Sequence, residues 1–146
     1  MKLKYIAIQG DAKNKEEAIG LCGEALFNSG FVGKTFSENC ILREREFPTG
    51  LPTNIPVAIP HCKDESVIQD SVCFLKLNRP IQFYRMDDEE EIIETDIVFN
   101  LAIKESEKHV DVLSNLIKFV TNSENLELCK SLDILEIPKF LENKIG

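Results

Sequence analysis

The first thirty residues combine a short apolar run with a segment of helical spacing. Residues 3–8 (LKYIAI) are rich in β-branched and aromatic side chains, which predicts a strand that the following Gly-Asp pair ends. Asn14 with Glu17 three residues later is typical of a capping box at a helix start. The apolar residues that then share one helical face are Ala18, Leu21, Cys22, Ala25 and Leu26, before Ser29-Gly30 ends the helix.

A second helix is predicted over residues 36–46, with Thr35 or Ser37 as its N-cap. An irregular, proline-rich loop follows it. This loop contains a short predicted strand at 57–59, which Pro60 limits because proline has no N–H to donate to a neighbouring strand.

Two longer apolar segments, 71–79 and 95–103, predict two further strands. The second is apolar on both faces, so we expect it to be central in a sheet whose two faces are covered. The acidic stretch 83–94 (FYRMDDEEEIIE) between them is typical of a solvated loop or an edge hairpin, and we assign it no role.

The last third of the chain is predicted to be helical. Ser106 is placed as the cap of a helix, and two short helices are expected over 126–129 and 132–141. The side chains predicted to face inward from the first of these helices are Val110, Leu113, Ile117 and Val120. The element order β-αα-βββ-ααα predicts an α/β (α+β) fold, a three-layer α/β/α sandwich around a mixed β-sheet.

Composition narrows the class of protein. The 146 residues are enough for one domain, 1–146, and 43% of them are hydrophobic, which favours a compact globule. Seventeen Lys and Arg against 25 Asp and Glu give a net charge of -8, which argues against nucleic acid as a partner. We find no signal-peptide core and no stretch long enough for direct membrane insertion, so a cytoplasmic protein is expected.

The five cysteines have irregular spacing and form no CxxC pair. This pattern is typical of reduced thiols in a core and not of a disulfide framework or a zinc site.

Of the two histidines, His61 stands directly after Pro60 at the end of the short predicted strand. Strand ends are where sites are usually built in open α/β structures. From position alone, however, an exposed loop histidine is the commoner explanation. Cys62 beside it is a poor partner for a shared proton, because adjacent residues of an extended chain point to opposite sides.

Two further residues could bind an anion. His109 lies in the first turn of a predicted helix, where backbone N–H groups and the helix dipole favour negative charge. Arg43 offers a planar fork of donors that matches a phosphate or a carboxylate. Each has a simpler explanation, since both positions are also typical of solvated surface residues. A metal site from His61, His109 and a carboxylate is a further alternative, although no ligand spacing supports it.

Taken together, these residues match a known pattern. Arg43-Glu44, the FPTG motif at 47–50 and the VAIPH motif at 57–61, followed by an isolated histidine at a helix start, resemble the enzyme IIA domains of the bacterial sugar phosphotransferase system (PTS), of the mannitol/fructose type. The resemblance spans nearly the whole chain. The FPTGLPT form, with a longer segment before His61, is most similar to the galactitol-specific branch.

The resemblance implies a phosphoryl carrier that needs no cofactor and no bound metal. His61 would accept a phosphoryl group from the carrier protein HPr and pass it to a cysteine of enzyme IIB, which can be joined to the membrane enzyme IIC. Arg43 and His109 fall on the family's other active-site positions, so both are expected to bind the phosphoryl oxygens. Thr49 is expected to add a further hydrogen bond to that group.

The sequence departs from the galactitol branch at two positions. Cys62 stands where threonine is common in that branch, and Asp87 stands where a glycine usually follows the residue equivalent to Met86. Two alternatives to the carrier stay open. One is a regulatory module, of the nitrogen type or attached to a regulator, in which phosphorylation of His61 is a signal. The other is an inactive relative, which the joint presence of Arg43, His61 and His109 argues against.

Overall fold

The structure is a computed structural model that describes residues 3–104 and 106–146, with the side chains of 106–109 left out. In this part of the chain, six strands form one mixed sheet, in the order β1-β5-β6-β3-β2 with β4 also paired to β6. The strands are β1 (Lys4–Gly10), β2 (Gly50–Leu51), β3 (Val57–Ala58), β4 (His61–Cys62), β5 (Ser71–Tyr84) and β6 (Ile92–Ala102).

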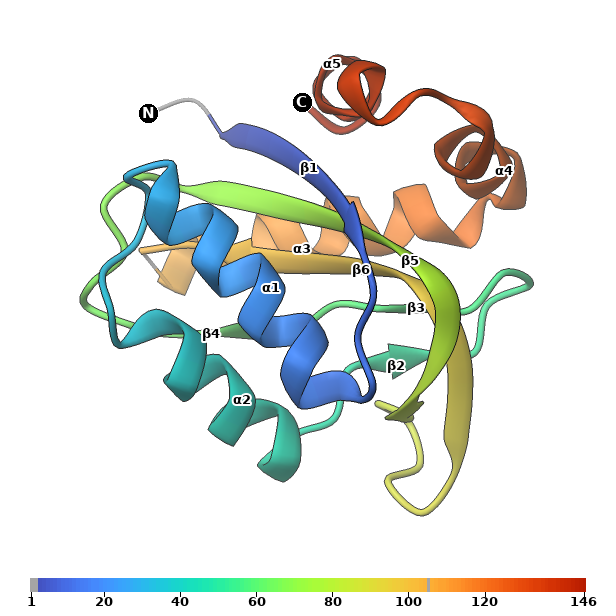
Figure 1. Ribbon diagram of the computed structural model, residues 1–146, viewed down its shortest axis with the longest axis horizontal. Coiled ribbons are helices and arrows are strands. Elements are labelled where there is room, and N and C mark those ends of the chain that lie inside the picture. Colours follow the sequence, from blue (N-terminus) through green and yellow to red (C-terminus); the bar gives the residue numbers. More distant parts are fainter. Residues whose placement is uncertain (1–2, 105) are drawn as a thin grey trace.

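Helices cover both faces of this sheet (Figure 1). On one face lie α1 (Lys15–Asn28) and α2 (Phe36–Glu46). On the other lie α3 (Ser106–Thr121), α4 (Ser123–Ser131), the short 3-10 helix η1 (Ile134–Glu136) and α5 (Ile137–Ile145). The predicted α/β fold with three layers around a mixed sheet is therefore confirmed.

The two covered faces give two apolar cores. The core under α1 and α2 contains Ile19, Leu26, Phe36 and Leu75, and the core under α3 to α5 contains Phe74, Phe99, Phe119 and Leu141. In the second core, Phe74 contacts Phe99 edge to face with ring centroids 5.3 Å apart. Both faces of β6 are buried from residue 97 to 102, as its apolar sequence predicted for a central strand.

The N-terminal helices agree closely with their prediction. The Asn14 side chain accepts a hydrogen bond from the Glu17 N–H at 2.9 Å and caps α1. In a capping box, the Glu17 carboxylate would accept a hydrogen bond from the N–H of the N-cap residue, Asn14. Here it accepts from the N–H of the preceding residue, Lys13. Thr35 is the N-cap of α2, but its hydroxyl donates to Asp64 and not to the helix backbone.

The middle of the chain differs from the prediction. Five strands stand where three were expected, because β2 and β4 are two-residue strands with no periodic pattern to reveal them. β5 and β6 both extend into the acidic stretch, pair antiparallel and form a long hairpin. Its pairing is interrupted between Lys76 and Ile81, where Pro80 has no N–H to donate.

The inward face of α3 was predicted partly wrongly. Val110 is 67% exposed, whereas Leu116 and Phe119, which were not predicted, are buried. Among the described side chains of α3, the buried ones therefore lie further along the helix than was predicted. The predicted cap at Ser106 lies outside the described side chains. No helix in the described ranges is long and apolar enough to cross a membrane.

Candidate active site

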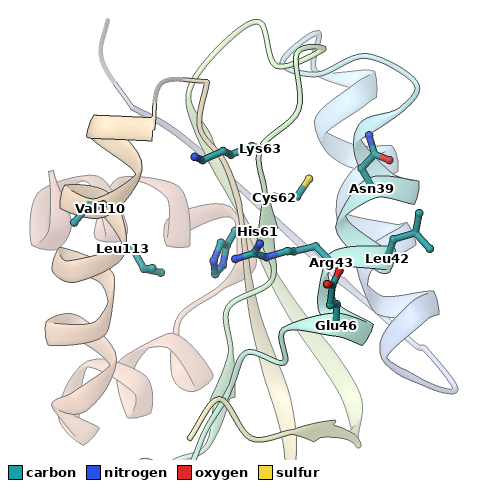
Figure 2. A pocket seen from close by; sticks show the side chains of 9 residues that line it. All are labelled: Asn39, Leu42, Arg43, Glu46, His61, Cys62, Lys63, Val110 and Leu113. Atoms are coloured by element: carbon teal, nitrogen blue, oxygen red, sulfur yellow. The ribbon is translucent and has the colours of Figure 1, made fainter. Parts of the chain in front are cut away.

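His61 lies at one end of the sheet, between α2 and α3 (Figure 2). Two adjoining cavities of about 650 and 470 Å³ open beside it. Both are lined by Arg43, Glu46, His61 and Leu113, so they form one cleft with His61 and Arg43 in its centre. A cleft of this size is large enough for a ligand, or for a group carried by another molecule, to reach His61.

The backbone on each side of His61 is held by β6. Pro60 has no N–H to donate, and the strand is interrupted there between β3 and β4. Both of these strands nevertheless pair with β6. The Pro60 carbonyl accepts hydrogen bonds from the Leu101 N–H at 2.9 Å and from the Asn100 side chain at 3.1 Å. These bonds fix the peptide that leads into His61.

The His61 ring is fixed by its own loop. Its Nδ1 lies 2.7 Å from the carbonyl oxygen of Ile59. A carbonyl can only accept, so Nδ1 carries the proton in this hydrogen bond and the neutral ring has its lone pair on Nε2. The tautomer is thus set by the backbone two residues earlier.

The environment of His61 favours the neutral ring. Burial lowers the pKa of His61 below its usual value, and the nearby positive charge of Arg43 lowers it further, while the hydrogen bond to Ile59 acts in the opposite direction. A neutral imidazole has an available lone pair and can act as a nucleophile.

Arg43 comes from the last turn of α2 and extends toward His61 (Figure 2). Its guanidinium stacks on the ring of Phe47, with Cζ 4.2 Å from the ring centroid. Stacking holds the planar fork in place while leaving its N–H groups able to donate. The structure therefore brings together Arg43 and His61, which were predicted from separate parts of the sequence.

Thr49 is placed differently from the expectation. It borders the cleft but is only 2% exposed, and both of its donors point to Glu44. The Thr49 N–H donates to Glu44 Oε2 at 2.8 Å, and the hydroxyl donates to Oε1 at 2.7 Å. Because both donors are already used, this geometry argues against the expected bond from Thr49 to a phosphoryl group.

The side chain of His109 lies outside the described residues, so its predicted place in the site stays a prediction. Its position is within the bounds of α3, and two later residues of this helix, Val110 and Leu113, line the cleft.

The rim of the cleft combines apolar and acidic groups. Exposed apolar side chains surround His61, namely Leu42, Phe47, Met86 and Val110. Asp87 and Glu89, from the turn between β5 and β6, line the same cleft. This turn is anchored, because the Met86 N–H donates to the Gly50 carbonyl at 2.8 Å. Such a rim suits a protein partner better than a small free ligand.

Two polar residues at the site were missed by sequence reasoning. Glu44 is buried, and burial raises its pKa to about 7, although both hydrogen bonds from Thr49 lower it. Asn100 is fully buried and supports Pro60. A signal existed for each: Glu44 belongs to the Arg-Glu pair of the motif, and Asn100 is an amide inside an otherwise apolar stretch of strand.

The cysteines are free and buried, as their spacing predicted. Cys62 points away from His61 into the core under α1 and α2, so the two do not form a nucleophilic pair (Figure 2). Among the described side chains, no three His, Cys, Asp or Glu residues are grouped so that they could hold a metal ion.

Comparison with known proteins identifies the family of the chain. Residues 1–144 match the family model "Phosphoenolpyruvate-dependent sugar phosphotransferase system, EIIA 2". The mannitol-specific phosphotransferase enzyme IIA component of Halalkalibacterium halodurans is 30% identical over 136 residues, which cover 91% of this chain and 87% of that protein.

Longer relatives contain a similar segment. The multiphosphoryl transfer protein of Shigella flexneri is 30% identical over 99% of this chain, which spans only 17% of that protein. Among solved structures, the complex of mannitol enzyme IIA with phosphorylated mannitol enzyme IIB from Escherichia coli is similar with a TM-score of 0.75 and 23% identity. The match covers 96% of this chain and 94% of that one, and it supports the fold.

Proposed function

We propose, since the chain belongs to the EIIA 2 family of the phosphoenolpyruvate-dependent sugar phosphotransferase system, that His61 carries a phosphoryl group from one protein partner to another. The observation that carries this proposal is the His61 ring itself: neutral, with its proton on Nδ1, and next to Arg43 in an open cleft. The relatives of this chain are phosphotransferase components.

The proposed step is a nucleophilic displacement at phosphorus. The lone pair on Nε2 of His61 attacks the phosphorus atom of a phosphohistidine on the donor, and the bond between phosphorus and the donor nitrogen breaks. The electron pair of that bond returns to the donor ring. The Nδ1–H bond to Ile59 stabilises the positive charge that develops on the His61 ring. Transfer to the next partner repeats the displacement with His61 as the leaving group.

Arg43 supplies electrostatic stabilisation in this proposal. The phosphoryl group in transit carries its charge on three oxygens, and its transfer depends mainly on positioning and on donors around them. The Arg43 fork, held by Phe47, is suited to donate to two of these oxygens. His109 is proposed as a second donor on the basis of the family resemblance.

The proposed partners are HPr as donor and an enzyme IIB as acceptor, which can be linked to enzyme IIC in the membrane. The apolar rim of Leu42, Phe47, Met86 and Val110 supports protein docking around His61. For the sugar, two candidates remain. The longer segment before His61 favours galactitol, whereas the relative from H. halodurans is mannitol-specific.

Intact-mass analysis tests the carrier role. The protein is incubated with phosphoenolpyruvate, enzyme I and HPr, beside a His61→Ala variant. We expect one acid-labile phosphoryl group on the parent and none on the variant. If HPr is phosphorylated but the parent protein gains no phosphoryl group, the proposal is wrong for this HPr.

Purified enzyme IIB domains then distinguish the finer possibilities. Transfer of the phosphoryl group from this chain to a galactitol-type or to a mannitol-type enzyme IIB identifies the branch. A phosphorylated chain that passes its phosphoryl group to neither type favours the regulatory alternative.

A further inference from the structure

We infer that Glu44 is a positioning residue, which orients the His61 imidazole through a chain of hydrogen bonds across Thr49 and Ile59. This role deepens the proposed function, on which its effect on phosphoryl transfer rests. Its effect on the ring itself can be measured without any partner.

The chain of hydrogen bonds is continuous from Glu44 to His61. Thr49 donates both its N–H and its hydroxyl to the Glu44 carboxylate, at 2.8 and 2.7 Å. The Thr49 carbonyl accepts from the Ile59 N–H at 3.3 Å. The Ile59 carbonyl in turn lies 2.7 Å from Nδ1 of His61. Two peptide segments therefore connect the carboxylate to the ring.

Every link before the ring is shielded from water. Glu44 and Thr49 are each 2% exposed, and Ile59 is fully buried. Water can neither replace a lost bond nor screen the carboxylate, so the orientation of each group depends on its partner. A buried carboxylate is costly in an apolar surrounding, and here it is kept where its two oxygens satisfy two donors of a single residue.

The same residue links the two halves of the site. Glu44 follows Arg43 in the last turn of α2, and its carboxylate holds the Thr49 loop that leads to β2. The helix that supplies the guanidinium is thereby tied to the strand pair that supports the imidazole. A shift of the Thr49 peptide would move the Ile59 carbonyl, which selects the Nδ1–H tautomer and so leaves the lone pair on Nε2.

The test compares Glu44→Ala and Glu44→Gln with Glu38→Gln, which changes an exposed carboxylate of the same helix. Histidine tautomers are read from ¹H–¹⁵N spectra of ¹⁵N-histidine-labelled protein, at a pH well above the His61 pKa. We expect the Nδ1–H form of His61 in the parent, in Glu38→Gln and, because its amide oxygen still accepts, in Glu44→Gln. In Glu44→Ala we expect a mixture of both tautomers.

Single-turnover transfer from phosphorylated HPr gives the kinetic readout. In Glu44→Ala we expect the maximal rate to fall about tenfold, with the half-saturating HPr concentration changed less than about twofold, because orientation and not docking is lost. Glu44→Gln should recover most of the rate. If Glu44 only stabilised the fold, we would not expect a lower maximal rate with an unchanged half-saturating concentration, or recovery of the rate in Glu44→Gln.

The outcomes separate the two claims. A folded Glu44→Ala protein with the parent tautomer and the parent rate would overturn the positioning role. If Glu44→Ala does not fold, Glu44→Met, which keeps the length of the side chain and removes both acceptors of the Thr49 hydrogen bonds, takes its place, and an unchanged His61 tautomer there is equally contrary. A changed tautomer in a chain that HPr never phosphorylates would keep the positioning role and remove the carrier function.

Discussion

At the scale of single residues, the site depends on the charge state of His61. Arg43 is one of the groups that lower its pKa, because a guanidinium next to the ring disfavours the imidazolium. We predict that Arg43→Gln raises the His61 pKa, as measured by NMR titration of the ring protons. Arg45→Gln, on the same helix, is the control and should leave the titration unchanged. A His61 pKa that stays the same or falls in Arg43→Gln would show that Arg43 does not act on the ring.

Glu44 gives a prediction for stability. Its pKa is raised from 4.5 to about 7, chiefly by burial, with smaller opposed effects of Lys15 and Glu16. The folded state therefore holds the proton more tightly than the unfolded state. The stabilisation is complete below about pH 4.5 and is lost as the pH rises through about 7, by on the order of 3 kcal/mol.

Chemical denaturation of the parent and of Glu44→Gln over this pH range checks the prediction. The free energy of unfolding of the parent should fall relative to that of Glu44→Gln as the pH rises. A constant difference between the two proteins would mean that Glu44 does not titrate in this window.

The sequence predicted individual site residues unevenly. His61 and Arg43 could be found because a sequence motif contains them. In the structure, both side chains line the cleft. Thr49 was found in the same motif, but its hydroxyl faces inward to Glu44, and no local pattern reveals which way a loop side chain turns. The support given by Asn100 depends on a contact with Pro60 forty positions away.

At the scale of elements, Gly50 joins the motif loop to the β5–β6 hairpin. A Cβ atom at this position would lie 2.6 Å from the Tyr84 carbonyl oxygen and 2.9 Å from Cγ1 of Ile93. We predict that Gly50→Ala lowers the free energy of unfolding by about 1–3 kcal/mol, because a backbone carbonyl must move to make room.

Gly20→Ala is the matched control, since a Cβ atom at Gly20 meets nothing within 4 Å and the residue lies inside α1. It should leave stability unchanged or raise it by about 0.5–1 kcal/mol. Urea denaturation of both variants decides the matter. Equal stability of the two variants would contradict the close packing of Gly50.

Prediction of the elements succeeded where they are long. α1 and α2 were predicted within about a residue because apolar spacing defines both helices and the Asn14 side chain caps α1. β2 and β4 were missed because two residues carry no period, and they exist only through pairing with β3 and β6. The buried face of α3 was misplaced at Val110 since the sequence does not say where the sheet beneath the helix ends.

At the scale of the whole molecule, the segment 95–103, which is apolar on both faces, correctly predicted a sheet with both faces covered. The order of strands could not be predicted, because β1 pairs in parallel with β5, more than sixty residues later, through contacts that only the folded chain makes. The same folding buries all five thiols, one of them next to His61 in sequence.

Burial of the thiols is directly testable. We predict that iodoacetamide adds nothing to the native protein and five groups in guanidinium chloride, as read by intact mass. Rapid labelling of a thiol under native conditions would contradict the packing of the two cores.

The most direct test of the carrier role is to locate the phosphoryl group. The ¹⁵N-histidine-labelled chain is phosphorylated by phosphoenolpyruvate, enzyme I and HPr, and ¹H–¹⁵N correlation spectra then identify the modified nitrogen. The geometry of the Ile59 hydrogen bond predicts a phosphoryl group on Nε2 of His61, with Nδ1 still protonated. Phosphorylation at Nδ1 of His61, or at His109 instead, would contradict the assignment of His61 Nε2 as the nucleophile.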